Sequence, residues 1–304
     1  MSGGASNALA LGSVALLFFA MGCGGDDDAS APAPGETKPT LRFETDSYTL
    51  QPGEEKYLCF TMRLPADKET TVVEFAPEYG VGTHHILFAQ TLAPESDSSF
   101  ECPVLFKQTW IPMYLGGVHS DPLRLPEGAG VQLAKGQQLL IQLHLQNTQA
   151  SPISAKTAMV MTLADPGAEV TPGGLFGLDN RKISIPPNTE DVKTEMSCQP
   201  KKEMDVYAVL GHMHKRGKEL EFSRGEGAGA EVLYKAAWDF NSQPTVPVSF
   251  HFGAADTAHL QCTHSNTGNQ MIGYGESSDD EMCAFVLYYT PYDGLAGCIA
   301  APQP

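Results

Sequence analysis

Apolar and polar residues alternate along many short stretches of this chain. The clearest alternation runs through residues 138–147, where every second residue would face the same side of a strand. One face would carry Leu139, Ile141, Leu143 and Leu145, and the other Leu140, Gln142, His144 and Gln146. No long segment repeats apolar residues at the helical period of about 3.6, and only residues 100–110 read as partly helical. The pattern therefore predicts an all-β protein.

Turn residues divide the strand-like stretches into two groups. They cluster at 164–167 and 171–174, and we place a domain boundary there, between residues 165 and 166. Because many short strands at regular spacing are typical of sandwiches, we expect two antiparallel β-sandwich domains, at 41–165 and 166–304. The predicted strands are 41–50, 56–64, 71–76, 84–91, 138–147, 155–163, 181–185, 191–198, 205–212, 219–223, 231–236, 246–252, 259–264 and 284–290.

The N-terminal segment has the pattern of a bacterial lipoprotein signal. An apolar run from 8 to 21 ends in small residues and Cys23, although no Lys or Arg precedes it. We expect a signal at 1–22, a lipid on Cys23 and a flexible tether over 23–40; an ordinary cleaved signal is the alternative. The run is too short to span a membrane. Gly24, rather than Asp, after Cys23 favours the outer membrane, so we expect an exported, membrane-anchored protein.

Charge and cysteine content narrow the function further. The net charge is −17 and no Lys/Arg-rich run exists, which argues against a nucleic-acid partner. Seven cysteines include Cys23, and the remaining six fit three disulfides in an oxidising compartment. Six cysteines allow 15 pairings, and the sequence alone does not choose among them.

The candidate chemistry centres on histidines. His212 and His214 are one residue apart at the end of a predicted strand, so both imidazoles share a face. Met282 could supply a third ligand, and a His-x-His pair with a thioether suits copper better than zinc or magnesium. A methionine alone is more often core packing. His144 lies on a polar face, and a lone histidine is usually a satisfied polar residue.

The adjacent pair His84 and His85 is ambiguous. Neighbours on a regular strand point to opposite faces, so both reach one metal only at a strand end or bulge, which the glycines of residues 80–83 permit. We interpret the other histidines as surface or satisfied polar groups: His119, His251, His259 and His264.

Other chemistries have little support. The sequence contains no Gly-rich phosphate loop, no G-x-S-x-G elbow, no H-E-x-x-H and no CxxC. Asp279-Asp280-Glu281 could form a carboxylate acid/base group, but we interpret it as a charged turn before a strand.

Several separated motifs, taken in order over about residues 41–298, resemble one family. They are Tyr57-Leu58-Cys59-Phe60-Thr61-Met62-Arg63-Leu64-Pro65, His84-His85-Ile86-Leu87-Phe88, Gln142-Leu143-His144, His212-Met213-His214, Ser277-Ser278-Asp279-Asp280-Glu281-Met282-Cys283 and Tyr288-Tyr289. These motifs resemble the copper type II, ascorbate-dependent monooxygenases. The resemblance implies two jelly-roll-like β-sandwich domains that each hold one copper, across a solvent-filled cleft.

Residue by residue, the resemblance also implies roles. An electron-transfer copper would be held by His84, His85 and His144, with Gln142 beside it, and an oxygen-binding copper by His212, His214 and Met282. The residues that act in catalysis would be His212, His214, Met282 and Gln142. The implied disulfides are Cys59–Cys102, Cys198–Cys298 and Cys262–Cys283, and one further family disulfide is absent because Ala89 replaces a cysteine.

The chain departs from the peptide-amidating member where that enzyme binds its substrate. Leu210 stands in place of an arginine that binds the peptide carboxylate, and Ala284 and Val286 replace an asparagine and a tyrosine. By strand parity, Leu210 shares a face with His212, and Ala284 and Val286 share one with Met282. A carboxylate buried there without a cation would be costly. We therefore expect that peptides ending in glycine are not the substrate.

The resemblance implies a reaction. A monooxygenase of this family inserts one oxygen atom of O2 into a C–H bond, with two electrons from ascorbate or a similar reductant and two coppers per chain. We expect a small, apolar or uncharged substrate. Two alternatives stay open: a non-enzymatic copper-binding lipoprotein for storage, delivery or sensing, and a structural or adhesive β-sandwich with incidental histidines. Copper-dependent oxygen uptake tests the first, and copper loss in His212→Ala and Met282→Ala variants tests the second.

Overall fold

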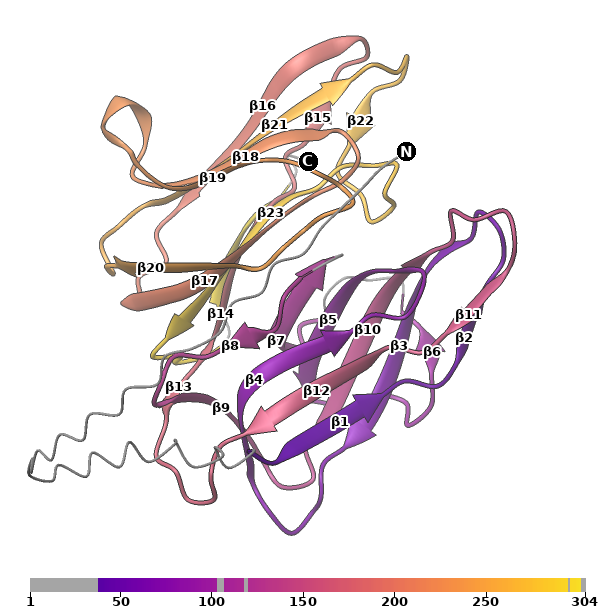
Figure 1. The fold of residues 1–304 in the computed structure, drawn as a ribbon. Coiled ribbons are helices and arrows are strands. Elements are labelled where there is room, and N and C mark those ends of the chain that lie inside the picture. Colours follow the sequence, from indigo (N-terminus) through magenta and orange to yellow (C-terminus); the bar gives the residue numbers. More distant parts are fainter. Residues whose placement is uncertain (1–37, 103–106, 118–119, 295, 302–304) are drawn as a thin grey trace, which may run out of the picture. The chain divides into compact units, whose positions relative to one another are not determined.

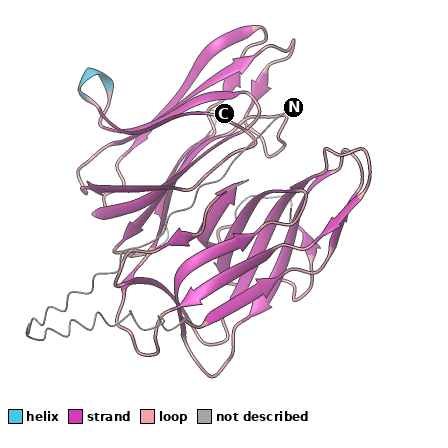
Figure 2. Cartoon of the chain, in the orientation of Figure 1, coloured by secondary structure: helices cyan, strands magenta, loops and turns pink. Residues whose placement is uncertain are grey.

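The chain folds almost entirely into β-strands. The computed structural model describes residues 38–301 except 103–106, 118–119 and 295, so the predicted signal, Cys23, most of the tether and His119 lie outside the described residues. The only helical element described is a short 3-10 turn, η1 (Gly227–Gly229), which Figure 2 shows in cyan. The all-β prediction is confirmed. Within the described ranges no helix is long and apolar enough to cross a membrane.

Two sheets of the N-terminal half enclose one apolar core. The first has the order β1-β12-β4-β9-β13, with β8 paired to β4, and the second β6-β3-β10-β5-β7; β2 pairs with β11 (Figure 1). The strands are β1 (Thr40–Glu44), β2 (Tyr48–Leu50), β3 (Glu55–Arg63), β4 (Thr70–Glu78), β5 (Thr83–Thr91), β6 (Phe100–Glu101), β7 (Trp110–Gly117), β8 (Leu123–Arg124), β9 (Ala129–Leu133), β10 (Gln138–Gln146), β11 (Ile153–Ala155), β12 (Ala158–Leu163) and β13 (Thr171–Pro172). Phe75 on β4 and Phe88 on β5 meet edge to face across the core, 6.0 Å between ring centroids.

The C-terminal half repeats this arrangement with different strands. One sheet has the order β20-β17-β23-β14-β24, the other β16-β21-β18-β19, and β15 pairs with β22 (Figure 1). The strands are β14 (Gly174–Asn180), β15 (Ser184–Ile185), β16 (Thr189–Cys198), β17 (Met204–Met213), β18 (Gly217–Arg224), β19 (Glu231–Ala237), β20 (Val246–Phe252), β21 (Ala258–Asn266), β22 (Ile272–Gly273), β23 (Cys283–Thr290) and β24 (Ala296–Ala300). Phe222 on β18 stacks on Phe285 of β23 at 4.8 Å between centroids, which joins the two sheets.

The alternation predicted for 138–147 is present in β10. Its odd-numbered leucines and Ile141 belong to the core between the sheets, whereas Leu140 packs in a separate cluster with the Cys59–Cys102 disulfide. All three disulfides implied by the family resemblance are formed, including Cys198–Cys298 and Cys262–Cys283.

Three sequence expectations need correction or refinement. Residues 100–110 are not helical where they are described, because β6 pairs with β3 and β7 begins at Trp110. Strands β7 and β14 were not predicted, since their Gly and Pro residues obscure the alternation. The change of partner strands falls near Gly173, between β13, which pairs with β9, and β14, which pairs with β23.

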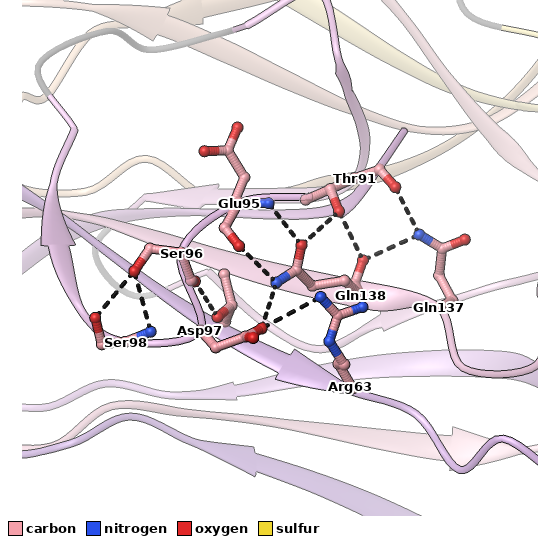
Figure 3. A network of polar contacts seen from close by, with 9 residues as sticks. Arg63, Thr91, Glu95, Ser96, Asp97, Ser98, Gln137 and Gln138 are labelled. Carbon is pink, nitrogen blue, oxygen red and sulfur yellow. Dashed lines mark hydrogen bonds and ion pairs between the residues drawn. The ribbon is translucent and has the colours of Figure 1, made fainter. Parts of the chain in front are cut away.

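A buried glutamine ties the segment after β5 to β10. Gln138 Oε1 accepts hydrogen bonds from Thr91 Oγ1 (3.1 Å) and the backbone N–H of Glu95 (2.9 Å), and its Nε2 donates to Glu95 O and Asp97 Oδ1, both at 3.1 Å (Figure 3). Because all these polar groups are paired, the connection between β5 and the next strands is fixed. This holds the N-terminal end of β10, and so supports the strand that carries His144.

Side chains from the C-terminal half also reach the N-terminal half. The hydroxyl of Tyr288 on β23 accepts a hydrogen bond from Leu115 N and donates one to Leu115 O on β7, both at 2.8 Å. Leu210 and Val286 join the core cluster of the N-terminal half. The facing sheets that carry β5, β7, β17 and β23 therefore lie in contact. His84 and His85 lie on β5, His144 on the neighbouring β10, and His212 and His214 at the end of β17.

Candidate metal centre

The first histidine set is formed by two neighbouring strands. Ligand atoms of His84, His85 and His144 all lie within 4.8 Å of one another. His144 on β10 pairs with His85 on β5, but Leu145 pairs with Thr83, so His84 is the extra residue of a β-bulge. Gly82, with φ of 88°, lies two residues before that bulge, at the turn into β5. The bulge is what allows two adjacent histidines to reach one place.

Most ring nitrogens of this set are buried without a hydrogen-bond partner. The three side chains are buried, with 7%, 6% and 1% of their area exposed. Nδ1 of His84, Nδ1 of His144 and both ring nitrogens of His85 are buried without a hydrogen-bond partner. Leaving such groups unsatisfied costs about 1–3 kcal/mol each. A metal ion would satisfy them, so the residues present fit the copper that the family implies.

Electrostatics keep these imidazoles in the form that binds metal. Burial, followed by the charges that protonated His144 and His212 would carry, lowers the pKa of His84 to about 3. The same causes lower the pKa of His85 well below its usual value. Both rings are therefore neutral near pH 7, and neutral imidazole is the metal ligand.

Neighbouring groups fix the orientation of two of the rings. His84 Nε2 donates to the carbonyl of Phe240 (3.2 Å), and His144 Nε2 donates to Glu55 Oε1 (2.7 Å). These bonds leave Nδ1 of each ring for a metal. The hydrogen bond from His144 lowers the pKa of Glu55 to about 2, against the opposing effect of burial, so the carboxylate is ionised at neutral pH.

The second set lies at the end of β17 and the start of β23. The register pairs His212 with Ala284, and Met282 immediately precedes β23. The rings of His212 and His214 are 5.2 Å apart and nearly perpendicular, and Met282 is 2% exposed. Nε2 of His212 and both ring nitrogens of His214 are buried without a hydrogen-bond partner. Chiefly through burial, the pKa of His212 is lowered to about 4 and that of His214 to about 2.

Two further residues hold this second set. His212 Nδ1 donates to Gln243 Oε1 at 2.8 Å, which leaves Nε2 for a metal. The buried carboxylate of Glu281 accepts hydrogen bonds from the backbone N–H groups of His214, Met282 and Arg216. Burial raises the pKa of Glu281 to about 7, while those three N–H groups oppose the rise. The carboxylate thus joins the strand ends that carry two candidate ligands.

The two sets lie side by side. The rings of His85 and His212 are 5.3 Å apart between centroids, at 84°. This differs from the solvent-filled cleft that the resemblance implies. The difference has a local cause, because residues of the C-terminal half contact ligands of the first set, as Phe240 does with His84.

An apolar cavity of about 90 Å³ opens beside His212 and Met282. Leu210, Ala284 and Val286, which the sequence predicts on this side of the second set, all line it. Its remaining walls include Leu115, Gly116 and Gly117 of β7 and Leu175, Gly177, Leu178 and Asp179 of β14. Asp179 is the one carboxylate among the described lining residues, and Arg181 Nε donates to its Oδ2 at 2.7 Å.

The structure places the remaining candidates as follows. Gln142, two residues before His144, lies against the first disulfide, with Nε2 3.7 Å from Cys102 Sγ. His251 is exposed and contacts Asp205 and Glu203, and His259 contacts Ser197. His264 is buried 3.9 Å from Glu281, with its other ring nitrogen bonded to Thr194.

Sequence reasoning missed the residues that support the ligands. These are Glu55, Tyr57 and Gln243, together with Glu281, which was interpreted only as part of a charged turn; Asp179, which lines the cavity, was missed as well. Glu281 lies next to Met282, so a buried role was within reach of the sequence. Gln243 has no such signal, since it lies in a loop between β19 and β20.

Comparison with known proteins gives a consistent result. The model of the family described as copper type II ascorbate-dependent monooxygenase, C-terminal domain, matches residues 174–304. Peptidyl-glycine alpha-amidating monooxygenase A of Xenopus laevis is 25% identical over 283 residues, covering 84% of this chain and 29% of that protein. The Mus musculus peptidyl-glycine alpha-amidating monooxygenase is 25% identical over 284 residues, covering 84% of this chain and 28% of that protein.

This chain therefore spans less than a third of the length of these relatives. Among solved structures, the major capsid protein P2 of bacteriophage PM2 is similar with a TM-score of 0.36 and 10% identity, over 84% of this chain and 98% of that one, too weak a likeness to bear on function. The family match over residues 174–304, the two amidating relatives and the gathered histidines together support a relationship to the copper type II, ascorbate-dependent monooxygenase family.

Proposed function

We propose that this protein holds two copper ions and hydroxylates a C–H bond of a small, apolar or uncharged molecule, with O2 and an ascorbate-like reductant. The first ion would be held by His84, His85 and His144, and the second by His212, His214 and Met282. Copper bound there supplies one-electron chemistry and oxygen activation, and the soft thioether favours the reduced ion. Support comes from buried ring nitrogens in both sets that have no hydrogen-bond partner.

The proposed class of substrate rests on the cavity beside the second set. Leu210, Ala284 and Val286 line it, and none of them offers a charge or a hydrogen bond. The described lining residues include no Lys or Arg that could pair with a carboxylate, and the nearby Arg181 is already bonded to Asp179. At about 90 Å³ the cavity is somewhat smaller than apolar cavities of roughly 150 Å³ that take up benzene. A compact apolar group would fit, with part of the substrate outside.

The protein's own residues would act by position and exclusion of water. Gln243 fixes the His212 ring, and Glu281 fixes the strand ends of His214 and Met282. The apolar walls would orient a substrate C–H bond towards the second set and keep water away. Peptides that end in glycine are outside this proposal, because their carboxylate would lie in the cavity without a partner.

Copper content and oxygen uptake test the proposal together. Protein produced without residues 1–23 is loaded with Cu(II), and its metal content and ascorbate-driven O2 consumption are measured with panels of small alkyl-aromatic and uncharged molecules. We expect two coppers per chain and substrate-stimulated uptake. Variants His212→Ala and Met282→Ala should lose the second copper, whereas the control His251→Ala, an exposed histidine, should keep both.

The outcomes separate the alternatives. Two coppers without turnover on any tested molecule would favour storage or delivery. Hydroxylation of a glycine-extended peptide would contradict the proposed substrate class. Fewer than two coppers would show that at least one ligand set is wrong.

We also propose that the protein is an exported lipoprotein anchored through Cys23. Three disulfides support an oxidising compartment. The full chain is expressed in a bacterium, with Cys23→Ala as the control. Mass spectrometry should detect a diacylglycerol adduct, and cell fractionation should find the protein in the membrane fraction, in the parent protein alone. Membrane association that persists in Cys23→Ala would contradict lipidation as the anchor.

A further inference from the structure

Two neighbouring side chains of β3 hold His144 of the first set. Glu55 Oε1 accepts a hydrogen bond from His144 Nε2 at 2.7 Å. The ring of Tyr57 stacks on the His144 imidazole, 4.4 Å between centroids and 5° between planes. Because Glu55 and Tyr57 are two residues apart on a strand, they share a face and act on the same imidazole.

The same two side chains also hold the loop that leads to Met282. Ser278 donates its backbone N–H to Glu55 Oε1 and its hydroxyl to Glu55 Oε2, both at 3.1 Å. The hydroxyl of Tyr57 donates to the carbonyl of Glu276 at 3.0 Å. Ser278 is fully buried, whereas the Glu55 side chain keeps 23% of its area exposed, so these contacts are partly buried. Glu55 and Tyr57 each touch both a ligand of the first set and the approach to the second.

Backbone hydrogen bonds hold this loop together. Asp280 N donates to Ser277 O (2.9 Å), and Gly275 N donates to Glu281 O (3.3 Å), which closes the loop on itself. A Cβ on Gly275 would lie 2.8 Å from the Cβ of Asp280, so a larger residue there would push the Asp280 side chain aside. At its end, Glu281 accepts hydrogen bonds from the N–H groups of His214 and Met282. A shift at Ser278 is therefore passed to two ligands of the second set.

We propose that Glu55 and Tyr57 are positioning residues that couple metal binding at the two sets. An ion held by His144 fixes that ring, which fixes Glu55 and Tyr57 and stabilises the loop position that presents Met282. The effect is reciprocal, since a coupling free energy acts equally on both sites. Couplings of this kind are on the order of tenfold in affinity. The inference rests on the two proposed metal sites but not on the oxygenase reaction.

The test is a metal-binding cycle that needs no turnover. The affinity for Cu(I) is measured by competition with a chromophoric chelator, and X-ray absorption reports the copper–sulfur contact of Met282. The second site is measured in the parent protein, with the first site filled, and in His84→Ala, with it empty. We expect the second site to bind about tenfold more tightly when the first is filled.

Ser278→Ala removes one hydroxyl contact to Glu55 and leaves the His144 bond in place. We expect this change to reduce the tenfold ratio toward one and weaken the copper–sulfur signal, while the affinity of the first site, measured with the second site empty, stays the same. The matched control is Glu54→Gln, which removes a neighbouring charge that contacts Gln51 and Lys56. The ratio should be unchanged in this control.

A merely local effect gives a different result. If Ser278→Ala weakens the second site equally with the first site filled and empty, or changes neither value, the inference is overturned. If Ser278→Ala does not fold, Tyr57→Phe removes only the hydroxyl bond to Glu276 and should reduce the ratio in the same way. If the protein binds two coppers but filling the first site does not change the affinity of the second, this inference alone is overturned. If it binds fewer than two coppers, the inference and the proposed function are both overturned.

Discussion

Gly117 and Gln243 lie in contact although they come from different halves of the chain. A Cβ at Gly117 would be 2.3 Å from the Cβ of Gln243, so only glycine permits this approach. Gly117 ends β7, which pairs with the strand of His85, and Gln243 accepts the hydrogen bond of His212. The backbone of the first half therefore sets the position of a side chain that orients a ligand of the second set.

Gly117→Ala should weaken metal binding at the second set. The added methyl group pushes Gln243 away, and loss of such support for a ligand typically costs about 10–100-fold in metal affinity. The matched control is Gly177→Ala on another wall of the same cavity, where a Cβ meets nothing within 4 Å. Copper competition titrations of both variants check this. If Gly117→Ala binds copper as tightly as Gly177→Ala, Gln243 does not act on the metal through His212.

Glu281→Gln should reduce stability and disturb the methionine ligand. The amide keeps one acceptor oxygen but places an NH2 group against a backbone N–H, which leaves buried groups unsatisfied at a cost of roughly 1–3 kcal/mol. Denaturant unfolding measures this cost, and X-ray absorption of the copper-loaded protein reports the sulfur contact. The control Asp279→Asn changes an exposed carboxylate of the same loop and should shift the free energy of unfolding by less than about 0.5 kcal/mol.

Val286→Phe should block the cavity without removing copper. Val286 is 8% exposed and lines the cavity, so the larger ring fills it and costs about 1–3 kcal/mol of stability through overpacking. We expect a higher KM or no turnover, with two coppers retained. Val232→Phe at an exposed position of β19 is the control. Unchanged kinetics in Val286→Phe would place the substrate elsewhere.

The disulfides should contribute unequally to stability. The bond between Cys262 and Cys283 spans 21 residues, and that between Cys198 and Cys298 spans 100. Loop-closure entropy in the unfolded chain then gives about 3 kcal/mol for the first and about 5 kcal/mol for the second. Paired Cys→Ala variants, unfolded by denaturant, should follow this order. The reverse order would mean that native contacts around the bonds outweigh chain entropy.

The metal-free protein should lose stability as the pH falls from about 6.5 to about 4. Burial depresses the pKa of five histidines, so over this range these histidines are protonated in the unfolded chain but not in the folded chain. The free energy of unfolding falls by up to about 1.4 kcal/mol per pH unit for each histidine. They are His84, His85, His212, His214 and His264. Glu281, with its raised pKa, opposes this loss but is a single group.

Thermal unfolding at several pH values measures the effect. The copper-loaded protein should unfold at a higher temperature at each pH until protons displace the metal, because the ion binds only the folded state. A melting temperature of the metal-free protein that is constant between pH 6.5 and 4.5 would show that these histidines are not buried in their neutral form.

Local features were predictable because strand geometry follows from neighbours in the chain. The alternation in 138–147 predicts both the core face of β10 and the polar position of His144. The glycines at 80–83 predict that a bulge could bring His84 and His85 together, and the register shift at β5 shows it. Strand parity places Leu210, Ala284 and Val286 on the side of the second set, and all three line the cavity.

What the sequence could not determine depends on contacts between distant segments. Strands β7 and β14, which complete the cavity, are rich in glycine and carry no clear alternation, because packing on neighbouring strands rather than local propensity forms them. The supports Glu55, Gln243 and Ser278 are polar residues of ordinary appearance until folding places them beside His144 and His212. The sequence by itself determined the all-β class, the alternating faces and the candidate ligands, since each depends on short-range order. Only the tertiary structure decided that the two histidine sets adjoin, because that adjacency comes from loops of one half bonded to strands of the other.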